Sequence, residues 1–120
     1  MKNILYVEDN DDNIYMLSAR MEFAGFCVTA AVDGETGVQM ASENDFDLII
    51  MDLILPGIDG WEACRQIRAC PASTNIPIIA LSSNATTEDR TRSLAVGCND
   101  FDTKPVDFKR LMRKIDSCLM

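Results

Sequence analysis

A short apolar run that ends in one carboxylate constrains the fold of this chain more than any other feature. Residues 48–51 are Leu, Ile, Ile and Met, and Asp52 follows them directly. An unbroken run of this length is typical of a strand buried on both faces of a parallel sheet, and Pro56 and Gly57 end it too early for a helix. A carboxylate beside so much hydrocarbon is costly unless its charge is compensated, so we expect other polar residues to converge on Asp52.

Four further segments read as strands, and helical segments alternate with them. The first helix has Ile14, Leu17, Met21 and Ala24 three or four residues apart, which predicts one inward face, and Gly25 ends it. A similar pattern of caps, apolar spacing and glycines recurs along the chain. The strands are predicted at residues 4–7, 26–31, 76–81 and 99–103, and the helices at residues 10–24, 35–43, 61–69, 86–96 and 107–119.

This alternation predicts an α/β fold with a parallel sheet and helices on both of its faces. Right-handed crossovers leave few topologies, and the simplest for five strands is the flavodoxin-like doubly wound sheet with strand order 2-1-3-4-5. No linker, repeat or low-complexity segment interrupts the chain, so residues 1–120 are expected to form a single domain.

Composition excludes several classes of function. The chain has no histidine, and its five cysteines form no C-x-x-C pair, which removes the usual zinc spacings and every histidine-dependent catalytic arrangement. A net charge of −8 disfavours direct binding to nucleic acid or to an anionic membrane. With no secretory leader and no membrane-spanning run in the sequence, we expect a cytoplasmic protein with no membrane insertion and with reduced thiols, which are Cys27, Cys64, Cys70, Cys98 and Cys118.

The first polar residue after several predicted strands carries a functional group. Glu8 and Asp9 follow the first strand, Asp52 follows the third, Ser82 the fourth, and Lys104 the fifth. Sites in open sheets of this kind form beyond the carboxyl ends of the strands, at the point where the strand order reverses. We therefore expect these five residues to gather in one pocket.

Three carboxylates in one pocket would repel one another, and a divalent cation removes that conflict. Ligands that are all oxygen favour Mg²⁺, for which Mn²⁺ is a plausible substitute. Lys104 and the Ser82 hydroxyl could neutralise the oxygens of a phosphoryl group, and carboxylates are known phosphoryl-accepting nucleophiles. The residues alone thus suggest a Mg²⁺-dependent aspartyl-phosphate site on Asp52.

Several of these residues also have plainer interpretations. The acidic run from Asp9 to Asn13 superficially resembles a calcium-binding loop, but Ile14 and Arg20 stand where that loop needs glycine and glutamate, so a solvated helix start is favoured. Trp61 is expected to pack within its helix rather than contact a partner. The basic residues of the last helix are expected to form a solvated face rather than a partner surface, and they are Lys109, Arg110, Arg113 and Lys114.

The pattern Glu8-Asp9, Asp52 with Pro56 and Asp59-Gly60, Ala80-Leu81-Ser82 and Lys104-Pro105 resembles the receiver domain of two-component response regulators, in its stand-alone, CheY-like form. The resemblance covers nearly all 120 residues, in order. It implies a signalling switch rather than a metabolic enzyme, one that catalyses only its own phosphorylation and dephosphorylation. The phosphoryl donor would be a sensor histidine kinase or a histidine phosphotransfer protein, and the phosphorylated form would control a downstream protein target.

The resemblance also implies roles for single residues. Asp52 would accept the phosphoryl group, and Glu8, Asp9, Asp52 and the backbone carbonyl of Ile54 would hold Mg²⁺. Lys104 would pair with the phosphoryl group. Ser82 would be the switch hydroxyl and Phe101 the aromatic that changes rotamer with it, so that the fourth helix, fifth strand and fifth helix form the face that a partner reads.

Several positions depart from the commoner pattern of the family or tune its kinetics. Glu8 replaces an aspartate, Ser82 replaces the commoner threonine, Ser83 replaces a small apolar residue, and Phe101 stands where tyrosine is also common. None of these changes removes a required group. Ile54 and Asn84 lie where the family tunes dephosphorylation, and we expect the bulk of Ile54 to prolong the phosphorylated state.

Other functions remain open from the sequence. The chain could be the receiver of a hybrid histidine kinase or of a regulator with an output domain, although its length argues against an attached domain. A metal-dependent phosphatase or phosphotransferase would want a second general acid or base and a loop that encloses its substrate. A flavin carrier of the same fold would want a phosphate-binding loop after the first strand, where this chain has four acids.

Overall fold

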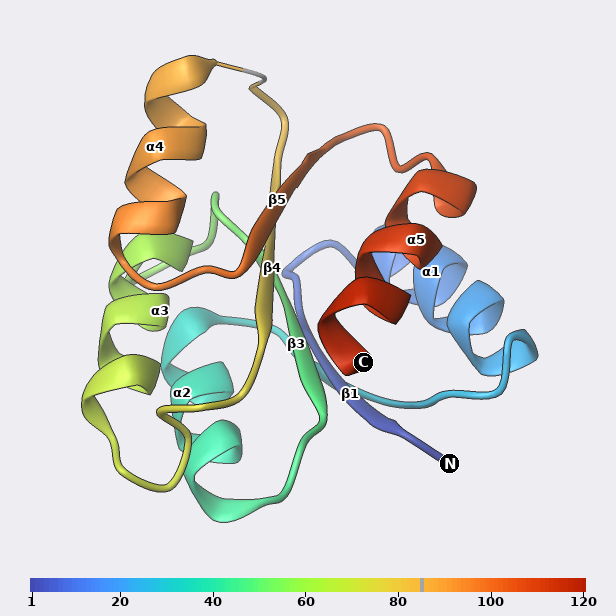
Figure 1. Cartoon of the computed structure of the whole chain (residues 1–120), viewed down its shortest axis with the longest axis horizontal. Coiled ribbons are helices and arrows are strands. Elements are labelled where there is room, and N and C mark those ends of the chain that lie inside the picture. Colours follow the sequence, from blue (N-terminus) through green and yellow to red (C-terminus); the bar gives the residue numbers. More distant parts are fainter. Residues whose placement is uncertain (85) are drawn as a thin grey trace.

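A five-stranded parallel sheet in the order β2-β1-β3-β4-β5 runs through the centre of the computed structural model, which describes residues 1–84 and 86–120. Helices α1 and α5 cover one face of the sheet, and α2, α3 and α4 cover the other (Figure 1). The predicted fold class is confirmed. The strands are β1 (Asn3–Val7), β2 (Cys27–Ala31), β3 (Leu48–Asp52), β4 (Ile78–Ser82) and β5 (Asp100–Thr103), and the helices are α1 (Asp11–Phe23), α2 (Gly34–Glu43), α3 (Gly60–Ala69), α4 (Thr87–Ala95) and α5 (Phe108–Leu119).

The central strands divide their side chains between two cores. Every residue of β3 and β4 is buried, which explains why their apolar runs show no alternation in the sequence. Successive side chains of a strand point to opposite faces, so Ile49 and Met51 join the core under α2 and α3, while Leu48 and Ile50 join the core under α1 and α5. Each fully buried aliphatic side chain of this kind contributes roughly 1.5–3 kcal/mol.

All five helices of the described chain begin at a polar residue that caps them. In each case the side chain accepts a hydrogen bond from the backbone N–H three residues later, which satisfies one of the donors left free at a helix start. The caps are Asn10, Asp33, Asp59, Thr86 and Asp107. These caps set where the chain leaves the carboxyl edge of the sheet, which is the edge expected to carry the site.

The structure corrects three details of the sequence analysis. Ala24 is exposed and lies one residue past α1, so it does not belong to the inward face of that helix. Strand β4 starts at Ile78 rather than at residue 76 and extends to Ser82. The basic face of α5 is not simply solvated: Arg110 Nε donates to Asp102 Oδ1 at 2.8 Å, and Lys114 Nζ lies 3.7 Å from the same oxygen.

Trp61 packs against the neighbouring helix α4. Its indole Nε1 donates to the Ser93 hydroxyl at 3.0 Å, and the Arg92 guanidinium lies 4.0 Å from its ring centroid. Both partners belong to α4, so Trp61 joins α3 to α4.

Among the described residues, no helix is both long enough and apolar enough to cross a bilayer.

Arg68, near the end of α3, bonds this helix to the segment before β4 and to the turn between α4 and β5. Its guanidinium donates to the carbonyls of Gly97, Thr74 and Ile76 and to the Asn99 side chain, at 2.7–3.1 Å. These acceptors lie before β4 and in the turn between α4 and β5. Removing the guanidinium would leave several partly buried acceptors without a donor.

We expect Arg68→Ala to lower the free energy of unfolding by about 2–3 kcal/mol, because the lost donors leave unsatisfied acceptors. Urea unfolding followed by circular dichroism measures this loss. The matched control is Arg65→Ala on the same helix, which breaks only a surface ion pair with Glu62 and should change the free energy of unfolding far less. Equal losses for the two variants would contradict this account of Arg68.

Candidate functional site

One lysine ammonium joins the ends of β1 and β3. Lys104 Nζ lies 2.7 Å from Glu8 Oε1 and 3.1 Å from Asp52 Oδ2. Glu8 and Asp52 are 1% and 3% exposed, so two carboxylates are buried almost completely at the carboxyl edge of the sheet. Lys104 directly follows β5, and its backbone N–H donates to the carbonyl of Ser82 at the end of β4. The convergence expected from the sequence is therefore found for these three residues.

Asp9 completes an acidic cluster with the two buried carboxylates. Glu8, Asp9 and Asp52 each offer one oxygen, and these oxygens lie within 4.8 Å of one another. Asp9 is exposed, so the cluster opens to solvent on its side. Three carboxylate oxygens without nitrogen or sulfur suit a hard cation such as Mg²⁺, which keeps several waters when it binds to proteins.

Glu8 has further partners that the sequence analysis missed. The Tyr6 hydroxyl donates to Glu8 Oε1 at 3.3 Å, and the Asn13 side-chain amide approaches the same oxygen at 3.5 Å. The backbone N–H of Asn10 donates to Glu8 Oε2 at 3.3 Å. A signal for Tyr6 was available, since residues two apart on a strand point to the same face. Asn13 was interpreted only as part of a helix start, and its reach to Glu8 depends on the turn between β1 and α1.

The pKa values of the two buried carboxyls are shifted in opposite directions. Burial and the charge of Glu8 raise the pKa of Asp52 to about 6, and the charge of Lys104 offsets this only in part. Burial alone would raise the pKa of Glu8, but hydrogen bonds from Lys104 and Asp52 outweigh it and lower that pKa. A proton taken up by the pair in the absence of a cation is therefore held mainly on Asp52.

The Ser82 hydroxyl faces the start of α4 rather than Asp52. Ser82 Oγ donates to Asp89 Oδ2 at 3.4 Å and accepts the backbone N–H of Asn84 at 3.0 Å. Ser82 is 1% exposed, whereas the side chain of Asn84 is exposed. Asp89 was predicted only as part of a helix start, so its contact with Ser82 is a feature that the sequence did not indicate.

The chain after Asp52 folds tightly around that carboxylate. The backbone N–H of Ile54 donates to Asp52 Oδ1 at 3.2 Å, while the Ile54 side chain is 60% exposed. Gly57 has a φ of +73°, and a Cβ at Gly60 would clash with the Asp52 carbonyl. Glycine is therefore needed at both positions, which accounts for the glycines that follow the central strand.

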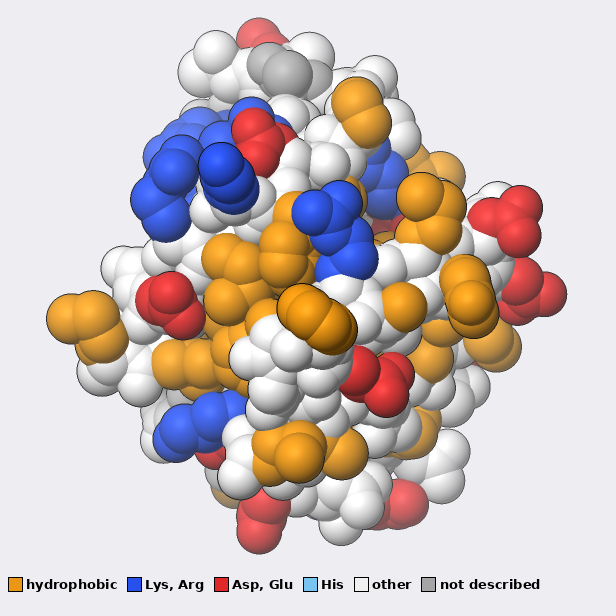
Figure 2. All heavy atoms as spheres, turned by 90° about the vertical axis from the view of Figure 1, so that its right-hand side faces the viewer, with side chains coloured by type: hydrophobic (Ala, Val, Ile, Leu, Met, Phe, Trp, Pro, Cys, Tyr) orange, Lys and Arg blue, Asp and Glu red, His pale blue; other side chains and the backbone are white. Residues whose placement is uncertain are grey.

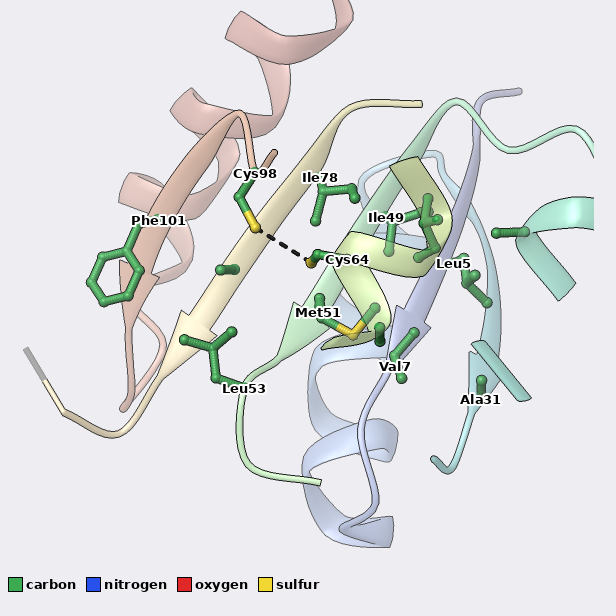
Figure 3. Close-up of a cluster of buried hydrophobic side chains, with 14 residues drawn as sticks. Leu5, Val7, Ala31, Ile49, Met51, Leu53, Cys64, Ile78, Cys98 and Phe101 are labelled. Atoms are coloured by element: carbon green, nitrogen blue, oxygen red, sulfur yellow. Dashed lines mark hydrogen bonds between the residues drawn. The ribbon is translucent and has the colours of Figure 1, made fainter. Parts of the chain in front are cut away.

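Phe101 is buried and lies on the edge strand β5, with its ring in the core shared with α3 (Figure 3). A surface hollow of about 270 Å³ adjoins it, between the start of α4 and α5. The face expected to be read by a partner therefore combines a buried aromatic with a polar hollow. The hollow is lined by Thr86, Thr87, Arg90, Phe101, Asp102, Thr103, Arg110 and Lys114.

A second, more apolar hollow of about 240 Å³ adjoins Lys104 on the other side. It lies between α1 and the segment before α5, and its lining includes Met16, Val106 and Phe108. Figure 2 shows apolar side chains gathered on this face of the molecule, with basic side chains among them. Tyr15, Met16 and Phe23 of α1 are 64–95% exposed.

The fold and the pocket together define a small parallel α/β domain with a lysine-bridged acidic pocket at the carboxyl edge of its sheet. The family described as the response regulator receiver domain matches residues 4–116. The chain therefore belongs to the response regulator receiver domain family. Membership supports the signalling interpretation over the flavin carrier and the small-substrate phosphatase.

Individual relatives agree with this assignment. Protein PilH of Pseudomonas aeruginosa is 33% identical over 119 residues, which cover 99% of this chain and 98% of PilH. The transcriptional regulatory protein HprR of Escherichia coli is 34% identical over 112 residues, which cover 93% of this chain and 49% of HprR. The chain spans a quarter to about half the length of several curated relatives.

A solved structure adds a comparison of the site. The receiver domain of sensor histidine kinase PA1611 from Pseudomonas aeruginosa has a TM-score of 0.91 and 38% identity, covering 98% of this chain and 97% of that one. It is described with a magnesium ion coordinated in its active-site cleft.

We expect the free energy of unfolding to rise by about 1.4 kcal/mol as the pH falls from 7.5 to 5 without divalent metal. The pKa of Asp52 is about 6 in the folded chain and lower in the unfolded chain, so the folded state binds this proton more tightly. The lowered pKa of Glu8 has the opposite effect on the free energy of unfolding. That effect appears mainly at pH values below the ordinary pKa of a glutamate, which lie outside the range from 7.5 to 5. Urea unfolding at several pH values, with chelator present, measures the change.

The control is Asp52→Asn, whose neutral amide should flatten the profile between pH 5 and 7.5. Added Mg²⁺ should also flatten it, because a cation compensates the charge that burial disfavours. A profile that is flat in the parent chain would show that Asp52 is fully ionised without metal.

Proposed function

We propose that this chain is a phosphorylation-controlled signalling switch in which Asp52 accepts a phosphoryl group from a phosphohistidine. One observation carries the proposal. Three carboxylates have oxygens within 4.8 Å of one another, and the Lys104 ammonium lies 3.1 Å from the most buried aspartate among them. A buried carboxylate next to an ammonium and a potential cation site is what phosphoryl transfer to an aspartate requires.

Glu8, Asp9 and Asp52, with the backbone carbonyl of Ile54, would hold Mg²⁺. The cation would supply charge neutralisation at the transferring phosphoryl oxygens. The raised pKa of Asp52 indicates that the buried carboxyl pair favours a positive charge nearby, which supports this assignment. Mn²⁺ presents the same preference for oxygen ligands and is proposed as a substitute.

In the transfer, the N–P bond of the donor breaks and an O–P bond to Asp52 forms. The Lys104 ammonium already contacts Asp52, so it would stay beside the acceptor and pair with the oxygens of the incoming phosphoryl group. These 120 residues contain no histidine, so the phosphohistidine must lie outside them. A sensor histidine kinase or a histidine phosphotransfer protein is therefore the proposed donor.

The apolar hollow beside Lys104 offers a contact surface for that donor. Asp52 is only 3% exposed, so the donor histidine must approach closely along the carboxyl edge. The exposed Met16 of α1 lines this hollow and would be covered by a docked partner.

Ser82 would transmit the effect of phosphorylation from Asp52 to the start of α4. A phosphoryl group on Asp52 adds strong acceptor oxygens, and the Ser82 hydroxyl would turn to donate to one of them. Doing so breaks its contacts with Asp89 and with the backbone of Asn84, which join it to the start of α4. Phe101 would then change rotamer, and α4, β5 and α5 would present a different face to a downstream protein target.

We expect acetyl phosphate and Mg²⁺ to form a labile phosphoryl adduct on the full chain, detected by intact mass. Asp52→Asn should abolish the adduct, because an amide is not a nucleophile for phosphorus. The matched control is Asp102→Asn, since Asp102 is equally buried at 3% but contacts Arg110 outside the pocket. An adduct that survives in Asp52→Asn, or a tightly bound flavin without any adduct, would refute the proposal.

Ile54 should set the lifetime of the phosphorylated state. Its side chain is exposed next to Asp52 and would hinder the water that attacks phosphorus. We expect Ile54→Asn to shorten the lifetime by about threefold to tenfold, a change of roughly 1 kcal/mol in the barrier. Ile54→Leu, which keeps the bulk, is the control. A lifetime as long or longer in Ile54→Asn contradicts this role.

A further inference from the structure

A pair of cysteines lies in sulfur contact within the core, away from the acidic pocket. Cys64 Sγ of α3 and Cys98 Sγ of the turn before β5 are 3.4 Å apart, although the residues are 34 positions apart in the chain. Figure 3 shows the two sulfurs directed toward each other between α3 and the sheet. Both thiols are free, and neither has a part in the proposed phosphoryl transfer.

We propose that Cys64 and Cys98 are a redox-active pair that peroxide converts into an intramolecular disulfide joining α3 to the turn between α4 and β5. The bond needs the sulfurs to approach from 3.4 Å to about 2.0 Å, a movement on the order of the displacement of one side chain. No other pair of the five cysteines is recorded in sulfur contact among the described residues.

The surroundings of the pair hold Cys98 in position. Arg68 donates to the carbonyl of Gly97 at 2.9 Å and to the Asn99 side chain at 2.9 Å, on either side of Cys98. Cys64 lies one helical turn before Arg68 on the same helix, so one element carries both the second thiol and the residue that anchors the turn. The two sulfurs are thus held together by contacts that do not depend on a disulfide.

The two thiols are not equivalent. The hydrogen bond from Cys64 and the charge of Arg68 lower the pKa of Cys98, whereas the hydrogen bond to Cys98 and burial raise the pKa of Cys64. Cys98 is also the more accessible of the two, at 5% exposed against 0%. Cys98 is therefore the sulfur that forms the thiolate and reacts first.

The reaction balances with hydrogen peroxide as the oxidant. The Cys98 thiolate attacks one peroxide oxygen, the O–O bond breaks, and a sulfenic acid and hydroxide form. The Cys64 sulfur then attacks the sulfenic sulfur, and the S–O bond breaks as the S–S bond forms. The Cys64 proton leaves with the departing hydroxide as water, so two thiols and one peroxide yield one disulfide and two waters.

The site is independent of the phosphoryl-acceptor pocket. Cys98 precedes β5 and so lies toward the amino ends of the strands, whereas Glu8, Asp52 and Lys104 lie at the carboxyl ends. Oxidation can be measured without phosphorylation, and its failure would leave the proposed function untouched.

The test is peptide mapping of the full chain after peroxide treatment, under non-reducing conditions. Trypsin leaves Cys27 and Cys64 in the same peptide, residues 21–65, so the experiment uses Cys27→Ser, a change at an exposed position. We expect this peptide to be linked to the peptide that begins at residue 93 and contains Cys98, and the link to disappear with dithiothreitol. A link through Cys70 or Cys118, or one between two chains, would overturn the proposal.

A second set of experiments tests whether the folded structure is what brings Cys64 and Cys98 together. The same treatment in urea should give mixed pairings at a lower rate, because the unfolded chain does not hold the two sulfurs together. In Cys64→Ala, Cys98 should accumulate a sulfenic acid that dimedone traps, whereas in Cys98→Ala the Cys64 thiol should stay unmodified. Equal trapping in the two variants, or two native thiols that stay unreacted, would show that the pair only packs the core.

The oxidised chain should also be more stable to heat. Closing a loop of this length constrains the unfolded chain, so Tm should rise on the order of 10 °C over the reduced chain. This comparison needs no core substitution, because the same protein is measured before and after reduction. A Tm that stays the same or falls while the link is present would contradict a disulfide that fits the native geometry.

Discussion

The Lys104 ammonium contacts two buried carboxylates, and this contact allows Glu8 and Asp52 to lie together at the carboxyl edge of the sheet. Glu8 and Asp52 end neighbouring strands and are almost fully buried, which without compensation would cost several kcal/mol for each charge. Lys104 reaches both from the end of β5, across β4, and its backbone is held by Ser82. Because this compensation is incomplete, Asp52 keeps a raised pKa, and the pocket favours additional positive charge. The same imbalance suits the pocket to a cation.

The apolar sheet keeps this polar edge in place. The strands β3 and β4 are buried along their full length, so they have little freedom to shift, and the groups at their carboxyl ends are fixed with them. The loops beyond those ends lie outside the packed sheet, on the surface. Ser82 stands at the boundary between the two regions, since its backbone belongs to β4 and its hydroxyl contacts Asp89 of α4. Ser82 therefore joins the end of β4 to the start of α4.

Helix α3 makes a second set of contacts, which hold the end of α4 and the turn before β5. Trp61 contacts Ser93, Cys64 contacts Cys98, and Arg68 contacts the turn before β5. These residues lie three or four apart, so they form one stripe along α3. The end of α4 is thus anchored to α3 while its start is bonded to Ser82. A helix held in this way can respond at its start without losing its place on the sheet.

The fold class, the strand order and the set of residues at the carboxyl edge could all be predicted from the sequence. This was possible because apolar runs, caps and glycines are local signals, and parallel strands bring their carboxyl ends to one edge. Which atoms meet there became clear from the folded chain alone. Lys104 bridges Glu8 and Asp52, Tyr6 and Asn13 donate to Glu8, and Ser82 faces Asp89. The folded chain also shows that two cysteines without any recognisable spacing touch. Contacts between residues that are far apart in the sequence depend on how helices pack and how side chains orient. Neither of these produces a periodic pattern in the sequence.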